Sequence, residues 1–153
     1  MNKENDIRIL NRSLEGEFFG IAAYEAALGS GVLEGGAETL ARKFQGDHKA
    51  HAKILAETIE SLGGVPARSK SMEEYSREFP RLSSQEDVIR YAIELERGAA
   101  SAHLSTVSKL STPELAELAA SISGDEAMHW AILLNAINED PVPVSFIPLA
   151  KTA

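Results

Sequence analysis

The sequence has no cysteine, and this absence excludes several kinds of site. Disulfides, zinc sites built from thiolates and iron–sulfur clusters all depend on cysteine sulfur. The chain can therefore contain none of the three.

Basic residues are also scarce, with 15 lysines and arginines against 23 acidic residues and a formal net charge of -8. Binding to nucleic acid depends on a basic face that neutralises phosphates, so we expect no nucleic-acid partner. An acidic balance is compatible with cations as ligands, although most acidic proteins are acidic only for solubility.

Long apolar runs are the third absence. The N-terminus, Met1 to Asp6, has no apolar signal region, and no segment approaches the length and hydropathy of a membrane span. We therefore expect a cytoplasmic protein that does not bind membranes.

The apolar residues that are present recur in steps of three and four, which predicts helices. A chain of 153 residues suits one domain. Expected long helices cover about 5–28, 37–62, 83–110 and 112–140, and a short helix over 72–79 interrupts the long connection. Ser83 with Glu86 has capping-box spacing, Thr112 with Pro113 begins the last helix, and Asp140 with Pro141 ends it.

The connections between these helices define the expected fold. Those within the first and last pairs are short, and one long connection separates the pairs. This pattern predicts an all-α four-helix bundle with one long crossover between the second and third long helices. The bundle would occupy residues 1–140, followed by an extended, proline-containing tail over 141–153.

The last long helix carries the most informative motif. Glu126 and His129 are three residues apart, so they share a helix face, and that face is otherwise apolar. Burying a carboxylate and an imidazole is costly unless they are paired, hydrogen-bonded or bound to metal. Gly-Asp precedes this pair, and it also precedes His48 and His51, 78 positions earlier.

A comparison of the two halves extends the repeat to the other two long helices. Glu17 and Glu96 lie 79 positions apart, each within an apolar stripe. In a bundle made of two such halves, we expect these polar residues to converge at one level of the core. The expected metal-ligand set is Glu17, His48, His51, Glu96, Glu126 and His129.

The arrangement resembles the ferritin-like superfamily, which includes rubrerythrins, bacterioferritins and related di-iron carboxylate proteins. The stretches 47–52 and 62–66 look closest to bacterial ferritin-like domain proteins, some of which are associated with stress or desiccation. The resemblance implies Glu17 and Glu96 as terminal ligands, Glu126 as a bridge, and His51 and His129 as ligands of one metal each. It also implies two iron ions, with manganese or zinc as alternatives, and a reaction of Fe(II) with O2 or peroxide.

His48 departs from that pattern, because the family has a bridging glutamate at this position. An imidazole nitrogen binds one metal, whereas a carboxylate can bridge two. His48 either takes the place of the missing bridge or is not a ligand. We expect the site to hold a second ion more weakly, or to hold one ion only. Asp47 and Asp125 are expected to orient histidines of the opposite half.

A second hypothesis follows from the same departure. The chain could be a ferritin-like helical scaffold with a degenerate or empty site, acting through protein contacts. The tail favours this hypothesis, because Val142 to Leu149 is apolar and rich in proline. We expect a homodimer, with the tail packed along or across the interface and covering apolar surface near Phe18, Phe19 and Trp130. The alternative is a monomer whose tail folds back on its own bundle.

Overall fold

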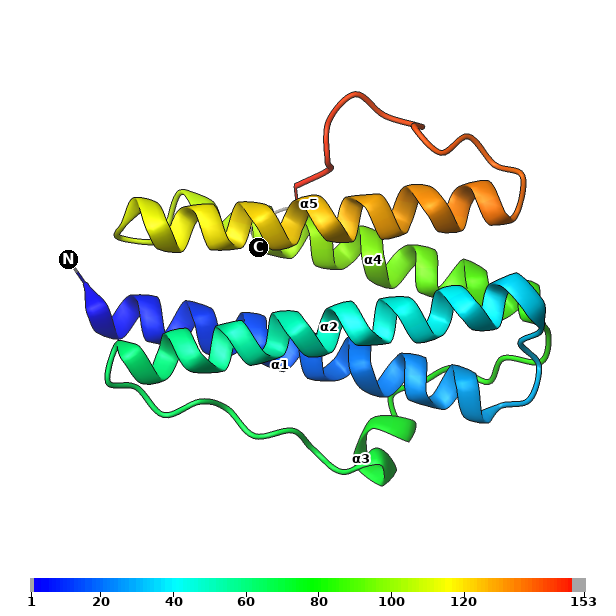
Figure 1. Cartoon of the computed structure of the whole chain (residues 1–153), viewed down its shortest axis with the longest axis horizontal. Helices are drawn as coiled ribbons and strands as arrows, with labels where there is room; N and C mark the ends of the chain where they lie inside the picture. The colour runs from blue at the N-terminus through cyan, green and yellow to red at the C-terminus, as the bar shows by residue number, and fades with distance from the viewer. Residues whose placement is uncertain (1, 150–153) are drawn as a thin grey trace. The chain divides into compact units, whose positions relative to one another are not determined.

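The computed structural model describes residues 2–149, and in this range the chain forms five helices and no strand (Figure 1). The predicted all-α fold class is confirmed, with four long helices and one short helix in the long connection. None of the helices in the described range is long and apolar enough to cross a membrane. The helices are α1 (Lys3–Gly29), α2 (Gly35–Ser61), α3 (Met72–Ser76), α4 (Gln85–Val107) and α5 (Pro113–Ala136).

The chain divides into two compact units that correspond closely to the two halves of the repeat. We call residues 10–88 the N-terminal unit; it contains most of α1, together with α2 and α3. Within the described residues, 2–9 and 89–149 form the C-terminal unit, which contains most of α4 and the whole of α5.

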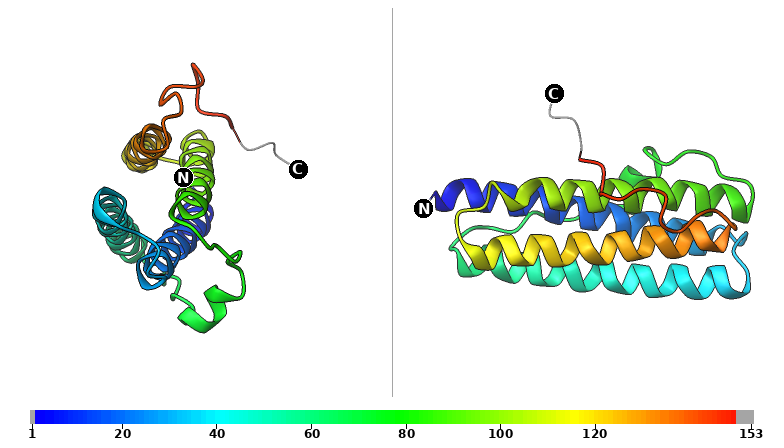
Figure 2. Two further views of the ribbon diagram at one scale, coloured as in Figure 1. Left: turned by 90° about the vertical axis from the view of Figure 1, so that its right-hand side faces the viewer. Right: turned by 90° about the horizontal axis from the view of Figure 1, so that it is seen from above.

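In the N-terminal unit, α1 and α2 lie side by side and run in opposite directions (Figures 1 and 2). Gly31 and Gly35, with φ angles of 73° and 55°, allow the tight turn between them, because glycine adopts positive φ without steric cost. The buried stripes of the two helices then pack together. Their most deeply buried apolar members are Leu10, Leu14, Phe44, Leu55 and Ile59.

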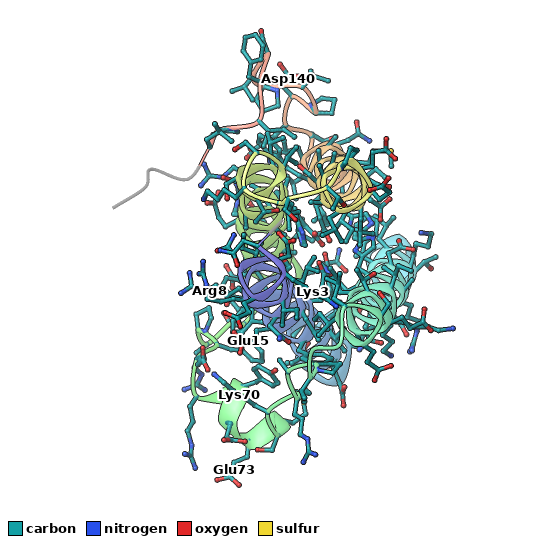
Figure 3. All side chains as sticks on the ribbon, turned by 90° about the vertical axis from the view of Figure 1, so that its left-hand side faces the viewer. Lys3, Arg8, Glu15, Lys70, Glu73 and Asp140 are labelled. Carbon is teal, nitrogen blue, oxygen red and sulfur yellow. The ribbon has the colours of Figure 1, made fainter. Side chains whose placement is uncertain are left out.

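The long connection is attached to α1 through aromatic contacts. The ring of Phe19 lies edge-on to those of Tyr75 and Phe79, with centroid distances of 6.0 and 5.3 Å. A capping box between Ser71 and Glu74 begins α3, and Glu73 on the same helix points outward (Figure 3). The outer surface that we expected Phe19 to offer is therefore covered by this connection.

In the C-terminal unit, α4 and α5 also lie side by side and antiparallel (Figure 2). The predicted start of α5 is confirmed, because the Thr112 side chain accepts a hydrogen bond from the Leu115 N–H and Pro113 follows it. The predicted cap of α4 was one residue off. Ser84, rather than Ser83, accepts the N–H of Asp87, and the Asp87 carboxylate accepts the Ser84 N–H in return.

The end of α5 also differs from the prediction, since the helix stops at Ala136 rather than at Asp140. Asn138 has a φ of 59°, and the N–H of Glu139 donates to the Leu134 carbonyl at 3.0 Å. This is the Schellman motif, in which a residue in the left-handed region satisfies the last carbonyls of a helix. Among the residue types, asparagine is second only to glycine in its preference for this left-handed conformation. Asn138 was therefore the sequence signal that α5 ends before Asp140.

The tail turns back along the C-terminal unit without forming a helix up to residue 149 (Figure 1). Most of its apolar side chains stay exposed, and Phe146 is 86% exposed. Trp130, which we expected on an outer surface, is buried. That the tail covers apolar surface near Trp130 stays a prediction.

A buried carboxylate connects the start of α1 to the loop before α5. Asp6 accepts hydrogen bonds from the Ser111 N–H, at 3.0 Å, and from the Ser111 hydroxyl. Asp6 is only 2% exposed. Both groups belong to the C-terminal unit, so this contact ties a segment distant in sequence to that unit.

We predict that Asp6→Ala lowers the free energy of unfolding by about 2 kcal/mol, because it removes two hydrogen bonds from Ser111 to a buried, charged carboxylate. Glu4→Ala, an exposed change in the same turn, is the control and should change stability by less than about 0.5 kcal/mol. Urea unfolding followed by circular dichroism measures both. Equal stability of the two variants would contradict the prediction.

Candidate metal centre

Three of the expected ligands meet inside the N-terminal unit, and we call them the N-terminal triad: Glu17 of α1 with His48 and His51 of α2. Glu17 and His48 are buried, and His51 is mostly buried. Glu17 Oε2 lies 2.7 Å from His48 Nδ1 and 3.5 Å from His51 Nδ1. One ligand atom from each of the three lies within 4.8 Å of the others.

The helix pattern explains why these polar groups are inside. Glu17 follows Leu14 by three residues on α1, and His48 follows Phe44 by four on α2, so each continues a buried apolar stripe. Tyr24 packs against both Phe44 and His48, with ring centroids 6.1 and 5.7 Å away. Tyr24 thus packs against the facing helix at the level of His48.

Three further expected ligands meet inside the C-terminal unit and form the C-terminal triad: Glu96 of α4 with Glu126 and His129 of α5. They are 0%, 0% and 2% exposed, respectively. His129 Nδ1 lies 3.4 Å from Glu96 Oε2 and 3.4 Å from Glu126 Oε2. The ligand atoms of this triad also lie within 4.8 Å of one another.

The separations in the C-terminal triad match those around a single metal ion. Two atoms bound at about 2.1 Å and at a tetrahedral angle lie about 3.4 Å apart. A direct hydrogen bond between an imidazole and a carboxylate is shorter, at about 2.7–2.9 Å. His129 Nδ1 is therefore separated from each carboxylate oxygen as two ligands of one ion would be.

The second ring nitrogen of His129 also has a carboxylate neighbour. Asp125 Oδ2 lies 3.4 Å from His129 Nε2, one turn earlier on the same helix. A histidine that binds metal through one nitrogen commonly donates its other N–H to such a carboxylate, which fixes the ring orientation. We expected Asp125 to orient a histidine of the other half; within the C-terminal unit it contacts His129 of its own helix.

The electrostatics of the C-terminal triad favour a cation. Burial by itself lowers the pKa of His129, but the hydrogen bonds and negative charges of Glu126 and Glu96 outweigh it and raise the pKa to about 10. Without metal, the protonated imidazole neutralises part of the buried negative charge. A metal ion that binds through Nδ1 replaces this proton and supplies positive charge in its place.

The donor types fit an oxygen- and nitrogen-binding metal such as iron, manganese or zinc. All six expected ligands have side chains that are buried or mostly buried, and each triad brings three of them together. That the two triads form one centre stays a prediction.

One residue of the site was not anticipated from the sequence. Gly20 of α1 lies directly against the His48 ring: an added Cβ would be 2.9 Å from Cε1 and 3.0 Å from Nδ1 and Nε2. Glycine inside a helix costs about 1 kcal/mol relative to alanine. A glycine three residues after Glu17 was therefore the signal of a close approach.

Comparisons with known proteins agree with this architecture. One similar solved structure, a conserved hypothetical protein of Mycobacterium tuberculosis, is 17% identical, with a TM-score of 0.77 over 94% of this chain and 97% of that one. Another, a ferritin-like di-iron carboxylate protein of Bacillus anthracis, is 23% identical, with a TM-score of 0.65 over 89% of this chain and 97% of that one. At these sequence identities, the likeness to the two solved structures shows the fold alone. No curated protein matches the chain.

The sequence itself matches a protein family. The ferritin-like domain family matches residues 5–139, which include the whole of both triads. Because this match spans most of the chain, the chain belongs to the ferritin-like domain family.

Proposed function

We propose that this protein binds two metal ions through its two triads and oxidises Fe(II) with O2 or peroxide. The observation that carries metal binding is the C-terminal triad, in which fully buried carboxylates and an imidazole are spaced as ligands of one ion. The family membership and the description of the Bacillus anthracis structure as a di-iron carboxylate protein support iron.

The two triads differ in charge, and this difference should order their affinities. The C-terminal triad has two carboxylates and one histidine, whereas the N-terminal triad has one carboxylate and two histidines. Two carboxylates balance the charge of one divalent ion, and a single carboxylate leaves one positive charge buried. We propose that the first ion binds at the C-terminal triad and the second, more weakly, at the N-terminal triad.

The redox part of the proposal depends on the ions. Two bound Fe(II) ions would supply two electrons, which with two protons reduce O2 to hydrogen peroxide or hydrogen peroxide to two waters. The protein's own contribution is to bind and orient the ions in a buried site. Glu96, Glu126 and His129 would hold the first ion, and Asp125 would orient the His129 ring. Removal of Fe(II) and peroxide together would protect a cell under oxidative stress.

We predict that protein purified without chelator contains metal and that anaerobic Fe(II) titration shows two unequal affinities. His129→Ala should weaken the tighter site about tenfold or more, and His51→Ala should do the same at the weaker site, because each removes a ligand. His103→Ala is the matched control: His103 is also buried, but it belongs to neither triad. Calorimetry and elemental analysis measure stoichiometry and affinity.

Two results would contradict this prediction. One is equal metal binding in the wild type and both ligand variants. The other is an equal loss in His103→Ala, which would mean that removal of any buried histidine disrupts the fold and that the triads have no special role. Circular dichroism of each metal-free variant distinguishes unfolding from loss of a ligand.

We predict that anaerobically loaded Fe(II) is oxidised on mixing with peroxide or O2, faster than free Fe(II) in the same buffer. Stopped-flow absorbance of the ferric product, with each oxidant in a separate experiment, measures the rates. His129→Ala should lose the acceleration while His103→Ala retains it. If the protein binds Fe(II) but neither oxidant reacts with it faster than with free Fe(II), the redox function is refuted and the metal-binding function stands.

The exposed tail favours a second proposal, contact with a second copy of the chain. Phe146 and its apolar neighbours in the tail are exposed, and so are Met128 and Ile132, one turn apart on α5. Burial of apolar area stabilises association by about 25 cal/mol per Å2. A symmetric pair in which each tail covers the other copy's α5 would remove both exposed surfaces from water.

We predict a dimer for the full chain and a monomer for a chain that ends at Asp140. Phe146→Asp should weaken the dimer without removing the tail, because it places a charge in the apolar contact. Sedimentation at several concentrations measures all three. A full chain that stays monomeric, or a truncated chain that still pairs, would refute the role of the tail.

A further inference from the structure

The imidazole of His48 packs against α1, where it contacts three residues on successive turns of the helix. Glu17 accepts a hydrogen bond from His48 Nδ1–H at 2.7 Å. Gly20 lies under the ring, and Tyr24 lies beside it with a centroid distance of 5.7 Å. All of these residues belong to the N-terminal unit.

The position of the ring over Gly20 follows from three distances. The point where a Cβ would lie is 2.9 Å from Cε1 and 3.0 Å from both Nδ1 and Nε2. A point nearly equidistant from three consecutive ring atoms lies over the face of the ring, not at its edge. The imidazole is therefore stacked flat on the backbone at Gly20, and this leaves its plane free to direct Nδ1–H at Glu17.

The distance between His48 and Glu17 differs from the other imidazole–carboxylate distances in the two triads. His51 and His129 direct Nδ1 to carboxylate oxygens at 3.5 and 3.4 Å, the separation of two ligands of one ion. His48 Nδ1 is 2.7 Å from Glu17 Oε2, which is the length of a direct hydrogen bond. A bond of this kind fixes the orientation of the carboxylate and shares its charge.

We propose that His48 is a positioning residue for Glu17 and not a metal ligand, and that Gly20 is the residue that makes room for it. This inference rests on the proposed metal-binding function and refines the N-terminal triad. His48 holds Glu17 in a single orientation, and Glu17 and His51 bind the ion. The affinity for the more weakly bound ion then depends on the hydrogen bond from His48, which stands where the family pattern has a bridging carboxylate.

The test uses Co(II), which is paramagnetic and shifts the ring N–H signals of the histidines bound to it much further than those of nearby residues. In the wild type we expect shifted, exchangeable imidazole N–H signals from two histidines, His51 and His129. Signals from three histidines would overturn the proposal. This measurement needs no variant, so it holds even where a substitution impairs folding.

Variants then separate the hydrogen bond from the ring. His48→Asn keeps an N–H donor close to the position of Nδ1, and it should retain the weaker Co(II) affinity within about threefold. His48→Ala should lose it by about tenfold or more, the usual cost of removing a group that orients a ligand. A loss in His48→Asn as large as that in His48→Ala would refute positioning.

Gly20→Ala tests the place of the ring without changing any polar group. The added methyl displaces His48, so the weaker affinity should fall about as far as in His48→Ala. Gly16→Ala is the matched control, because it adds the same methyl to the same helix with nothing within 4 Å. Both changes favour the helix, so a similar affinity in the two variants would contradict the role of Gly20.

The proposal and the metal function can fail separately. If the wild type binds no Co(II), the proposed function fails. Nitrogen-15 NMR of the metal-free protein still tests the hydrogen bond, because His48 Nδ1 should then carry a proton that exchanges slowly. Glu17→Gln should speed that exchange, and a His48 Nδ1 without a proton would overturn the positioning role.

Discussion

The cost of burying charge governs this molecule more than any other single constraint. Glu17, Glu96 and Glu126 are almost fully removed from water in helices that are otherwise apolar on the same face. An ionised carboxylate is stable in such a place only when nearby groups compensate its charge. In each unit the compensation comes from histidine, which lies on the facing helix for Glu17 and Glu96 and on the same helix for Glu126. The antiparallel pairing of the two helices, and their register, must bring these groups together for either unit to fold.

The two units meet this constraint differently, because different groups compensate the charge of their buried carboxylates. In the C-terminal unit the compensating imidazole has its pKa raised to about 10, after burial is outweighed by Glu126 and Glu96, so a proton occupies the position where a cation fits. In the N-terminal unit a short hydrogen bond from His48 compensates part of the charge of the Glu17 carboxylate. One unit is thus arranged around an exchangeable positive charge and the other around a fixed hydrogen bond. The two halves of the repeat thus compensate their buried carboxylates in different ways.

The sequence was sufficient to predict the helices and the buried or mostly buried positions of the six polar residues, because both follow from periodicity and from the cost of burial. It was not sufficient where several local options had equal merit. Ser83 and Ser84 both offered a cap, and Asn138 competed with Pro141 as the end of α5. The sequence also could not reveal that the connection covers Phe19, because residues 75 and 79 reach α1 only through the three-dimensional path of the chain. Ring stacking on Gly20 depends on the spacing of two helices, which residue spacing alone does not specify.

The contact between Gly20 and His48 also restricts how the two positions can change over time. While an imidazole occupies position 48, any side chain at position 20 collides with it, so glycine is retained although it weakens the helix. Once position 48 carries a smaller or more flexible side chain, position 20 is free to gain a methyl group. Substitutions at the two positions are therefore ordered: histidine must leave before glycine can. Among relatives of this chain, we therefore expect glycine at position 20 wherever position 48 is histidine.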